Sequence, residues 1–307
     1  MPLFRGFRGK QGTKFTKIVV IVLAVAFVGG LLYTGSVMVQ EPAQGGHEVI
    51  ATVNGRPITR SGFEQGYLNA ILAEYEFTGR VLPETIGPIR IALLDQFIDT
   101  LLIAEAAEKE KIRVTSKEIN EEFKLQEEAF TSKEEFRNAL TANNITEAQF
   151  KSLIKDRLMI QKLFDQVQSG VIVTEEDVKQ AYTDETGDPA EGDNFNAKKS
   201  EIETALQLKA KEDALTEWLK KLRENAEVKL NDAELRALMS LREKEYEKAI
   251  MEYNSAIALD PENAYLRVGI AQAFIADDKP NQAIEALEEA SNLQPEDAYI
   301  RLLLGLA

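Results

Sequence analysis

Side chains that commonly carry enzymatic chemistry are scarce in this sequence. It has no cysteine and a single histidine, His47, which follows two glycines in a short polar segment. That setting is typical of a solvated linker residue, and it argues against a serine triad or a multi-histidine metal site. Adjacent carboxylates that could act as general acid and base occur at 121–122 and 127–128. Both pairs lie in stretches dense with charge, which is typical of a solvated helix face.

Motifs and net charge restrict the function further. The sequence contains no phosphate-binding loop, nucleophile elbow or metal-ligand spacing. It has 36 Lys and Arg against 51 Asp and Glu, which gives a net charge of −15. An acidic exterior repels the phosphates of nucleic acid, so nucleic acid is not expected as a partner. We therefore predict no catalytic residue, no metal and no cofactor, and we look for surfaces that bind other polypeptides.

A β-hairpin is the first element that could position such a surface. Asn54-Gly55 is a strong signal for a tight turn between the two extended parts of 48–59. Ser61 and Glu64 have the spacing of a capping box, which predicts that a helix begins there.

A third strand is expected because an isolated hairpin is only marginally stable. The best candidate is 226–230, which follows a long helical pattern. We therefore predict a mainly α fold, in which a helical domain over 48–230 is closed by a small antiparallel sheet. Hairpin 48–59 and strand 226–230 would form this sheet, with Val228 beside Val53.

Several helices are expected between the hairpin and the third strand. One runs from 63 to about 77, and a strongly apolar one runs from about 88 to 109; Gly79 and Pro83 separate them. Capping boxes predict three further helix starts, at Thr115-x-x-Glu118, Thr131-x-x-Glu134 and Thr146-x-x-Gln149. Residues 183–197 are rich in glycine, proline and acids, and we predict a flexible linker there, after which helix resumes.

The N-terminus has the pattern of a membrane anchor. Residues 1–17 are basic, and the run 18–39 contains 22 residues without charge. At about 1.5 Å per residue this run spans the ~30 Å hydrocarbon layer. A cleaved signal peptide is the alternative, although its apolar core usually has about 7–15 residues. The distribution of charge predicts a cytoplasmic tail 1–17, a transmembrane anchor 18–39, a tether 40–47 and an extracytoplasmic remainder.

The last part of the chain, 231–307, repeats itself every 34 residues. This is the period of the tetratricopeptide repeat, a helical hairpin. Four positions recur at this interval: Ala249, Ala256, Leu259 and Pro261 correspond to Ala283, Ala290, Leu293 and Pro295. Two units and a partial third are present. Because three or more repeats are normally needed for stability, we expect the array to pack on the preceding domain, to use its last helix as a cap, to dimerise, or to belong to a longer chain.

Three stretches together resemble the SurA/PrsA/PpiD group of bacterial extracytoplasmic chaperones over roughly 49–230. They are the hairpin ATVNGRPITRSGFEQ, the helix LLDQFIDTLLIAEAAEKEKIRVTSKEI and the segment VTEEDVKQAY at 173–182. In many members a parvulin prolyl isomerase module follows the last of these stretches, whereas here only 183–197 stands in its place. Parvulin activity also relies on pocket histidines, which His47 cannot supply. The resemblance therefore implies a chaperone without isomerase activity.

Two functions follow from these patterns. The first is a chaperone, anchored by 18–39 as a single-pass protein of the bacterial cytoplasmic membrane, that binds unfolded secreted or membrane proteins near the Sec translocon. Phe77, Leu82 and Ile86, around the interruption between two predicted helices, are the candidate client contacts. The alternative is an adaptor whose tetratricopeptide array docks onto the translocon or another envelope protein. An enzyme is set aside for lack of a site.

Overall fold

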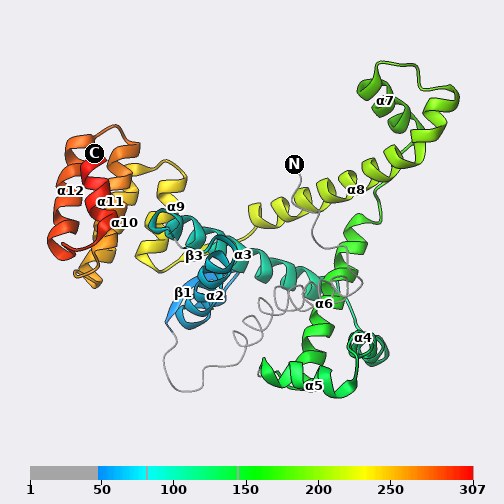
Figure 1. The fold of residues 1–307 in the computed structure, drawn as a ribbon, viewed down its shortest axis with the longest axis horizontal. Coiled ribbons are helices and arrows are strands. Elements are labelled where there is room, and N and C mark those ends of the chain that lie inside the picture. The colour runs from blue at the N-terminus through cyan, green and yellow to red at the C-terminus, as the bar shows by residue number, and fades with distance from the viewer. Residues whose placement is uncertain (1–47, 81, 144, 307) are drawn as a thin grey trace. The chain divides into compact units, whose positions relative to one another are not determined.

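The structure is a computed structural model that describes residues 48–80, 82–143 and 145–306. The predicted tail 1–17, anchor 18–39 and tether 40–47 lie outside these residues. Across the described ranges, no helix has both the length and the apolarity needed to cross a membrane. The chain is mainly helical with one small sheet, and it forms two compact units (Figure 1). We call Asp99–Ala226 the helical unit, and the described residues up to Ile98 together with Glu227–Ala307 the sheet–repeat unit.

The sheet contains three antiparallel strands in the order β2-β1-β3. They are β1 (Val49–Val53), β2 (Arg56–Thr59) and β3 (Val228–Leu230). Val53 pairs with Val228, so the predicted third strand is confirmed. Asn54 and Gly55 both have positive φ, at 50° and 81°, as a type I′ hairpin turn requires. The Asn54 amide donates to the Glu227 carbonyl at 2.9 Å, and the Asn54 side-chain oxygen accepts from the Glu227 amide at 2.8 Å.

Two helices follow the hairpin: α2 (Arg60–Thr78) and α3 (Pro83–Lys109). The predicted start of α2 at Ser61 is wrong, because Thr59 is the N-cap and its side chain accepts from the Gly62 amide. Gly79 ends α2 with φ 76°, and its amide bonds the Tyr75 carbonyl. The apolar helix α3 begins five residues earlier than predicted, with Pro83 in its first turn and Pro88 inside it. Proline is well suited to the first turn of a helix. A backbone amide at that position has no partner within the helix, so no hydrogen bond is lost because proline lacks one.

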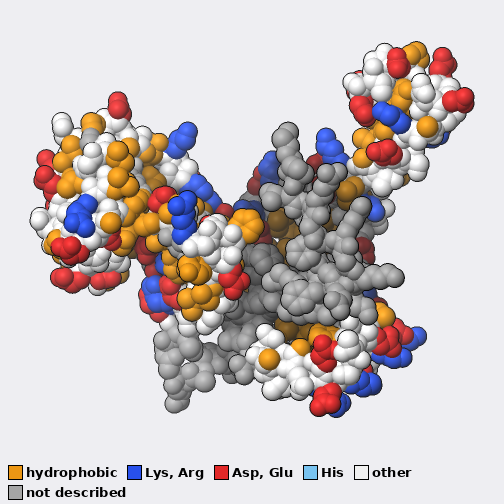
Figure 2. Space-filling model, viewed as in Figure 1, with side chains coloured by type: hydrophobic (Ala, Val, Ile, Leu, Met, Phe, Trp, Pro, Cys, Tyr) orange, Lys and Arg blue, Asp and Glu red, His pale blue; other side chains and the backbone are white. Residues whose placement is uncertain are grey.

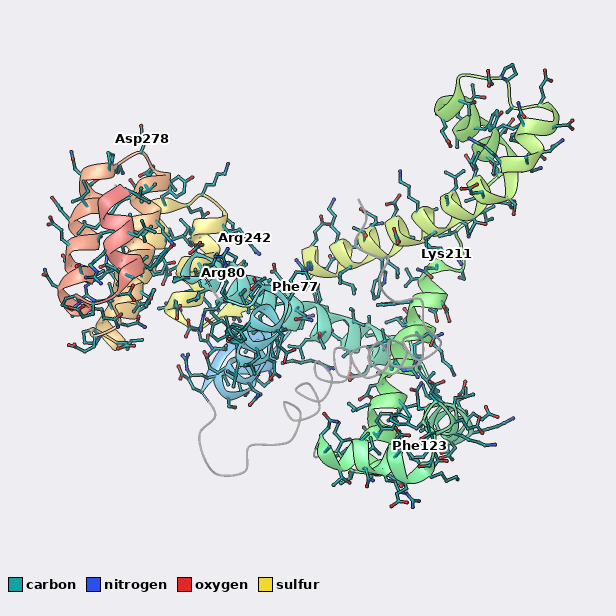
Figure 3. All side chains as sticks on the ribbon, viewed as in Figure 1. Phe77, Arg80, Phe123, Lys211, Arg242 and Asp278 are labelled. Carbon is teal, nitrogen blue, oxygen red and sulfur yellow. The ribbon has the colours of Figure 1, made fainter. Side chains whose placement is uncertain are left out.

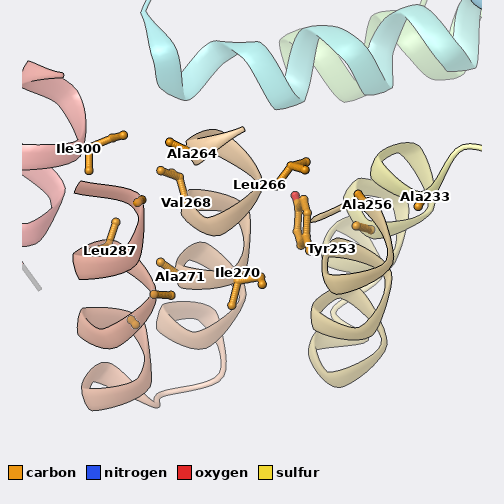
Figure 4. Close-up of a cluster of buried hydrophobic side chains, with 14 residues drawn as sticks. Ala233, Tyr253, Ala256, Ala264, Leu266, Val268, Ile270, Ala271, Leu287 and Ile300 are labelled. Atoms are coloured by element: carbon orange, nitrogen blue, oxygen red, sulfur yellow. The ribbon is translucent and has the colours of Figure 1, made fainter. Parts of the chain in front are cut away.

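The repeat region consists of antiparallel helical hairpins. Its helices are α9 (Ala233–Arg242), α10 (Tyr246–Leu259), α11 (Ala264–Ala276), α12 (Pro280–Leu293) and α13 (Ala298–Leu306). Figure 4 shows their core, where small side chains such as Ala264 and Ala271 let the helices approach closely. The largest buried side chain is Tyr253, which projects from α10 toward α11. The predicted two hairpins and partial third are confirmed.

Replacing Gly269 by alanine is expected to lower the free energy of unfolding by about 1–2 kcal/mol. A Cβ at Gly269 would lie 2.4 Å from the ring of Tyr253. In a helix interior, alanine is more stabilising than glycine by about 0.5–1 kcal/mol. Overpacking a core costs about 1–3 kcal/mol, so the steric cost exceeds the gain in helix propensity. Urea unfolding measures the difference. Gly305→Ala is the control, since nothing lies within 4 Å of its added Cβ; equal stability of both variants would contradict the prediction.

The helical unit contains the second half of α3 and five further helices: α4 (Ser116–Glu128), α5 (Lys133–Ala142), α6 (Glu147–Gln168), α7 (Glu175–Thr186) and α8 (Gly192–Glu224). The capping boxes at Thr115 and Thr146 are confirmed. The one predicted at Thr131 is wrong, because Ser132 is the N-cap and accepts from the Glu135 amide at 3.1 Å. Phenylalanine rings from α4, α5 and α6 form the local core by edge-to-face contacts.

The predicted flexible linker 183–197 is also wrong. Helix α7 continues to Thr186 and α8 already begins at Gly192, so only a short turn joins them. The rings of Tyr182 and Phe195 meet edge to face, with centroids 5.3 Å apart, and both side chains are buried. These two rings pack in one cluster with Val178 and Ile202, which joins the two helices, and the composition of 183–197 does not reveal this cluster.

Candidate functional site

The acidic pairs that could have acted in catalysis are engaged in ion pairs. Glu122 pairs with Arg157, and Glu127 lies 3.0 Å from the amine of Lys133. Their neighbours Glu121 and Glu128 pair with lysines on the same helix. No group of three or more His, Cys, Asp or Glu side chains that could hold a metal ion occurs in the described part of the chain. The remaining candidate sites are surfaces and pockets that bind without chemistry.

An apolar surface runs along α2. Four large side chains on this helix are exposed: Leu68 (52%), Leu72 (51%), Tyr75 (58%) and Phe77 (91%). We call these four residues the α2 surface. Leu68, Leu72 and Tyr75 follow the i, i+4, i+7 spacing of one helix face. Phe77 lies at the end of the helix, as marked in Figure 3, and its spacing from Leu68 places it on the opposite side.

The first turns of α2 pack tightly against α3. Phe63 is fully buried, and its ring centroid lies 6.0 Å from that of Phe97 on α3. Gly66 comes so close to α3 that a Cβ there would lie 3.2 Å from Leu93 and from Phe97. Beyond this contact the ring of Tyr67 lies against Arg90, whereas the four residues of the α2 surface are exposed to solvent. Exposed apolar patches of this kind mark sites of interaction.

The three predicted client contacts occupy different places. Phe77 belongs to the α2 surface. Leu82 is half-buried in the turn before α3, where its carbonyl accepts hydrogen bonds from the amide and hydroxyl of Thr85. Ile86 lines a pocket on α3. Leu68, Leu72 and Tyr75 were not predicted as contacts, because their spacing is equally typical of a buried helix face.

That pocket has a volume of about 530 Å³ and lies inside the sheet–repeat unit. The first half of α3 forms one wall, and α9, α10, α11 and α13 form the other. Figure 4 shows α3, the cyan helix, crossing over the repeat helices. We call it the composite pocket, because the hairpin-linked helix and the repeats both contribute to it.

A buried arginine connects α2, α3 and α9 next to this pocket. Arg90 is 8% exposed, and its guanidinium lies over the rings of Phe63, at 5.3 Å, and Tyr67, at 5.1 Å. Its Nη2 donates to Glu64 at 3.2 Å, and its Nε lies 3.5 Å from Glu234 of α9. Burial raises the pKa of the Glu234 carboxyl, and the charge of Arg90 opposes that rise. The arginine thus joins the hairpin region to the repeats through charge and ring contacts.

Comparison with known families covers most of the chain. Residues 3–164 match the model of the SurA-like N-terminal domain, and residues 240–307 match a tetratricopeptide repeat model. The first match includes more than half of the chain. This chain belongs to the SurA-like N-terminal domain family.

Two curated proteins are distant relatives of this SurA-like chain. It is 25% identical over 158 residues to the foldase protein PrsA of Clostridium acetobutylicum, and the aligned region covers 48% of this chain and 47% of PrsA. It is also 25% identical over 170 residues to the chaperone SurA of Nitrosospira multiformis, and this aligned region covers 53% of the chain and 38% of SurA. The chain therefore spans less than half the length of either relative. No solved structure gives a significant match.

The SurA-like match contains the α2 surface and the α3 wall of the composite pocket, and it ends within α6. The tetratricopeptide match contains α10 to α13 in full and begins inside α9. The composite pocket therefore lies where the SurA-like domain and the repeats of the same chain meet within one compact unit.

Proposed function

We propose that this protein is a chaperone that binds unfolded polypeptides on the α2 surface. The observation that carries the proposal is the exposure of four large apolar side chains along one helix of a SurA-like domain. Such a surface can hold apolar segments of an unfolded chain weakly and release them, without any chemical step. The many carboxylates elsewhere on the chain would keep the protein soluble beside aggregation-prone clients.

We further propose that the chaperone acts outside the cytoplasm, held at the bacterial cytoplasmic membrane near the Sec translocon. The support is the uncharged run 18–39 with basic residues before it. An anchor would keep the client-binding domain at high effective concentration where polypeptides emerge. Reporters fused to each end test this placement, since activity of a cytoplasmic reporter at the C-terminus would exclude it.

We also infer that the protein has no prolyl isomerase activity. The segment 183–197 stands where many members of the resembled chaperone group carry a parvulin module, and His47 is the only histidine. In this segment α7 and α8 are joined directly by a short turn.

One assay tests both parts of the chaperone proposal. The full chain is inserted into lipid nanodiscs and mixed with a chemically unfolded test protein whose refolding is limited by proline isomerisation. We expect stoichiometric amounts to suppress aggregation, and catalytic amounts to leave the slow refolding rate unchanged. Empty nanodiscs are the control. Aggregation that proceeds unaffected at excess chaperone would refute the binding function, and accelerated refolding would refute the absence of isomerase activity.

The second candidate function is an adaptor that docks through its repeats, and the tetratricopeptide match favours it because such repeats mediate protein interactions. Deleting everything after Leu230 would separate the two functions only if the remainder stayed folded. Helix α9 contributes Glu234 to the buried Arg90, and Leu238 lies against Gly87 of α3. Point substitutions in the composite pocket are therefore the cleaner tool.

A further inference from the structure

The composite pocket is large, with a volume of about 530 Å³. That volume lies in the range of about 300–1,000 Å³ found for ligand sites. The α3 wall includes the small residues Gly87 and Ala92, whereas the large side chains Leu94 and Phe97 of this helix are buried outside the pocket.

The lining of the pocket suits an apolar side chain. Ile91, Leu238 and Val268 contribute aliphatic surface from both walls. Two tyrosine rings, Tyr265 and Tyr299, lie at the pocket, and the Tyr265 hydroxyl donates to Asp297 at 2.7 Å. A ring fixed in this way offers a large contact area at little entropic cost, and tyrosine is enriched in protein interfaces for this reason.

Charges around the pocket favour a cationic ligand. Arg242 already pairs with Asp95 at 2.6 Å, and the buried Arg90 is occupied by Glu234 and Glu64. Glu84 is different, because it is exposed and has no ion pair within the described part of the chain. Glu84 and Tyr299 both line the pocket, and the charge of Glu84 contributes to the raised pKa of the Tyr299 hydroxyl, whose main cause is burial. A positive group bound at this edge would meet an unneutralised carboxylate.

The surrounding repeats strengthen this preference. From residue 227 to the end, the sequence has sixteen Asp and Glu against eight Lys and Arg. Figure 2 shows many of these carboxylates spread over the visible face of the repeats. An acidic surface accelerates the approach of a basic segment and disfavours an acidic one.

We propose that the composite pocket binds a polypeptide segment of a partner protein that carries an apolar side chain next to a lysine or arginine. The apolar side chain enters between Ile91 and Val268, and the cationic group meets Glu84. The partner therefore docks on the SurA-like helix α3 and the repeats together. This proposal gives the adaptor function a specific ligand class and rests on that function, but it does not depend on client binding by the α2 surface.

The test uses the full chain in nanodiscs and two fluorescein-labelled ten-residue peptides. One peptide alternates leucine with lysine, and the other alternates leucine with glutamate. Ala92→Trp fills the pocket from an exposed position on α3, and Ala258→Trp is the matched control on an exposed position of α10 outside the pocket. We expect Ala92→Trp to raise the Kd of the lysine peptide at least tenfold, whereas Ala258→Trp leaves it within about twofold.

A charge reversal gives an independent readout. Glu84→Lys changes an exposed side chain, so the fold is expected to persist even if Ala92→Trp disturbs it. The lysine peptide should bind this variant at least threefold more weakly, and the preference over the glutamate peptide should shrink. Binding that is indifferent to both substitutions, or equal for both peptides, would overturn the proposal. Aggregation suppression is measured on the same variants; its retention beside lost peptide binding separates this site from the chaperone surface.

Discussion

Replacing Leu68, Leu72, Tyr75 and Phe77 together by glutamine is expected to weaken the suppression of client aggregation at least tenfold. Burying one large apolar side chain contributes about 1.5–3 kcal/mol, so partial burial of all four by a client contributes about 3 kcal/mol. That energy corresponds to about a hundredfold in affinity. Glutamine keeps two methylene groups at each position, which retain part of this apolar contact, so the expected loss is at least tenfold.

The stability of the protein should change little in this variant. The four side chains are already more than half exposed, and glutamine retains a high helix propensity. The measurements are light scattering of an unfolded client at increasing chaperone concentration and the urea midpoint of each variant. Met251, Leu259 and Ile275, which are exposed on the repeats, are changed to glutamine as the matched control. Full activity of the α2 variant, or an equal loss in the control, would show that clients bind elsewhere.

The second large effect is expected at the buried arginine. Arg90→Met should lower the free energy of unfolding of the sheet–repeat unit by about 3 kcal/mol, the lower end of the cost of removing one partner from a buried ion pair. The lower end is appropriate because Glu64 and Glu234 keep 42% and 32% side-chain exposure. Arg90→Lys keeps the charge but not the planar group that lies over two rings, so an intermediate loss is expected.

The cost of Arg90→Met should grow with pH. Burial already raises the pKa of Glu234 above 4.5, and the positive charge of Arg90 opposes this rise. Without Arg90, the pKa of the Glu234 carboxyl in the folded state rises further above its value in the unfolded state. The deficit is therefore smallest below about pH 4.5 and increases as pH rises through the folded-state pKa. Urea unfolding at several pH values from 4 to 8 measures the difference between variant and wild type.

Glu234→Gln in the Arg90→Met background provides the internal control. Removing the unpaired carboxylate should recover a large part of the lost stability at neutral pH and flatten the pH dependence of the difference. A deficit that is independent of pH, or that persists unchanged in the double variant, would mean that lost packing rather than the ion pair is responsible.

The sequence predicted local turns and periodic features well. Asn54-Gly55 requires positive φ at both residues, and the instability of a lone hairpin pointed to the strand at Val228. The 34-residue period predicted the repeat hairpins because each repeat must bury its small residues against the next. These features depend on residues whose conformational or packing requirements can be read within one segment.

Contacts between distant segments were not predictable in the same way. Nothing in the local sequence around Arg90 predicts its contacts with Glu64 and Glu234. The spacing of Leu68, Leu72 and Tyr75 indicates an apolar helix face, but only the fold determines whether another element covers it. The composite pocket likewise depends on which face of α3 meets the repeats.

The pairing of β1 with β3 has a consequence for synthesis of the chain. Asn54 and Glu227 are bonded although they lie 173 residues apart in sequence. At about 5–20 residues per second, the hairpin waits roughly 10–35 s before its final strand leaves the ribosome. During that interval one edge of β1 has unsatisfied amides and carbonyls, which is a template for pairing with other chains. The nascent chain is therefore itself prone to aggregation until β3 has been synthesised and can pair with β1.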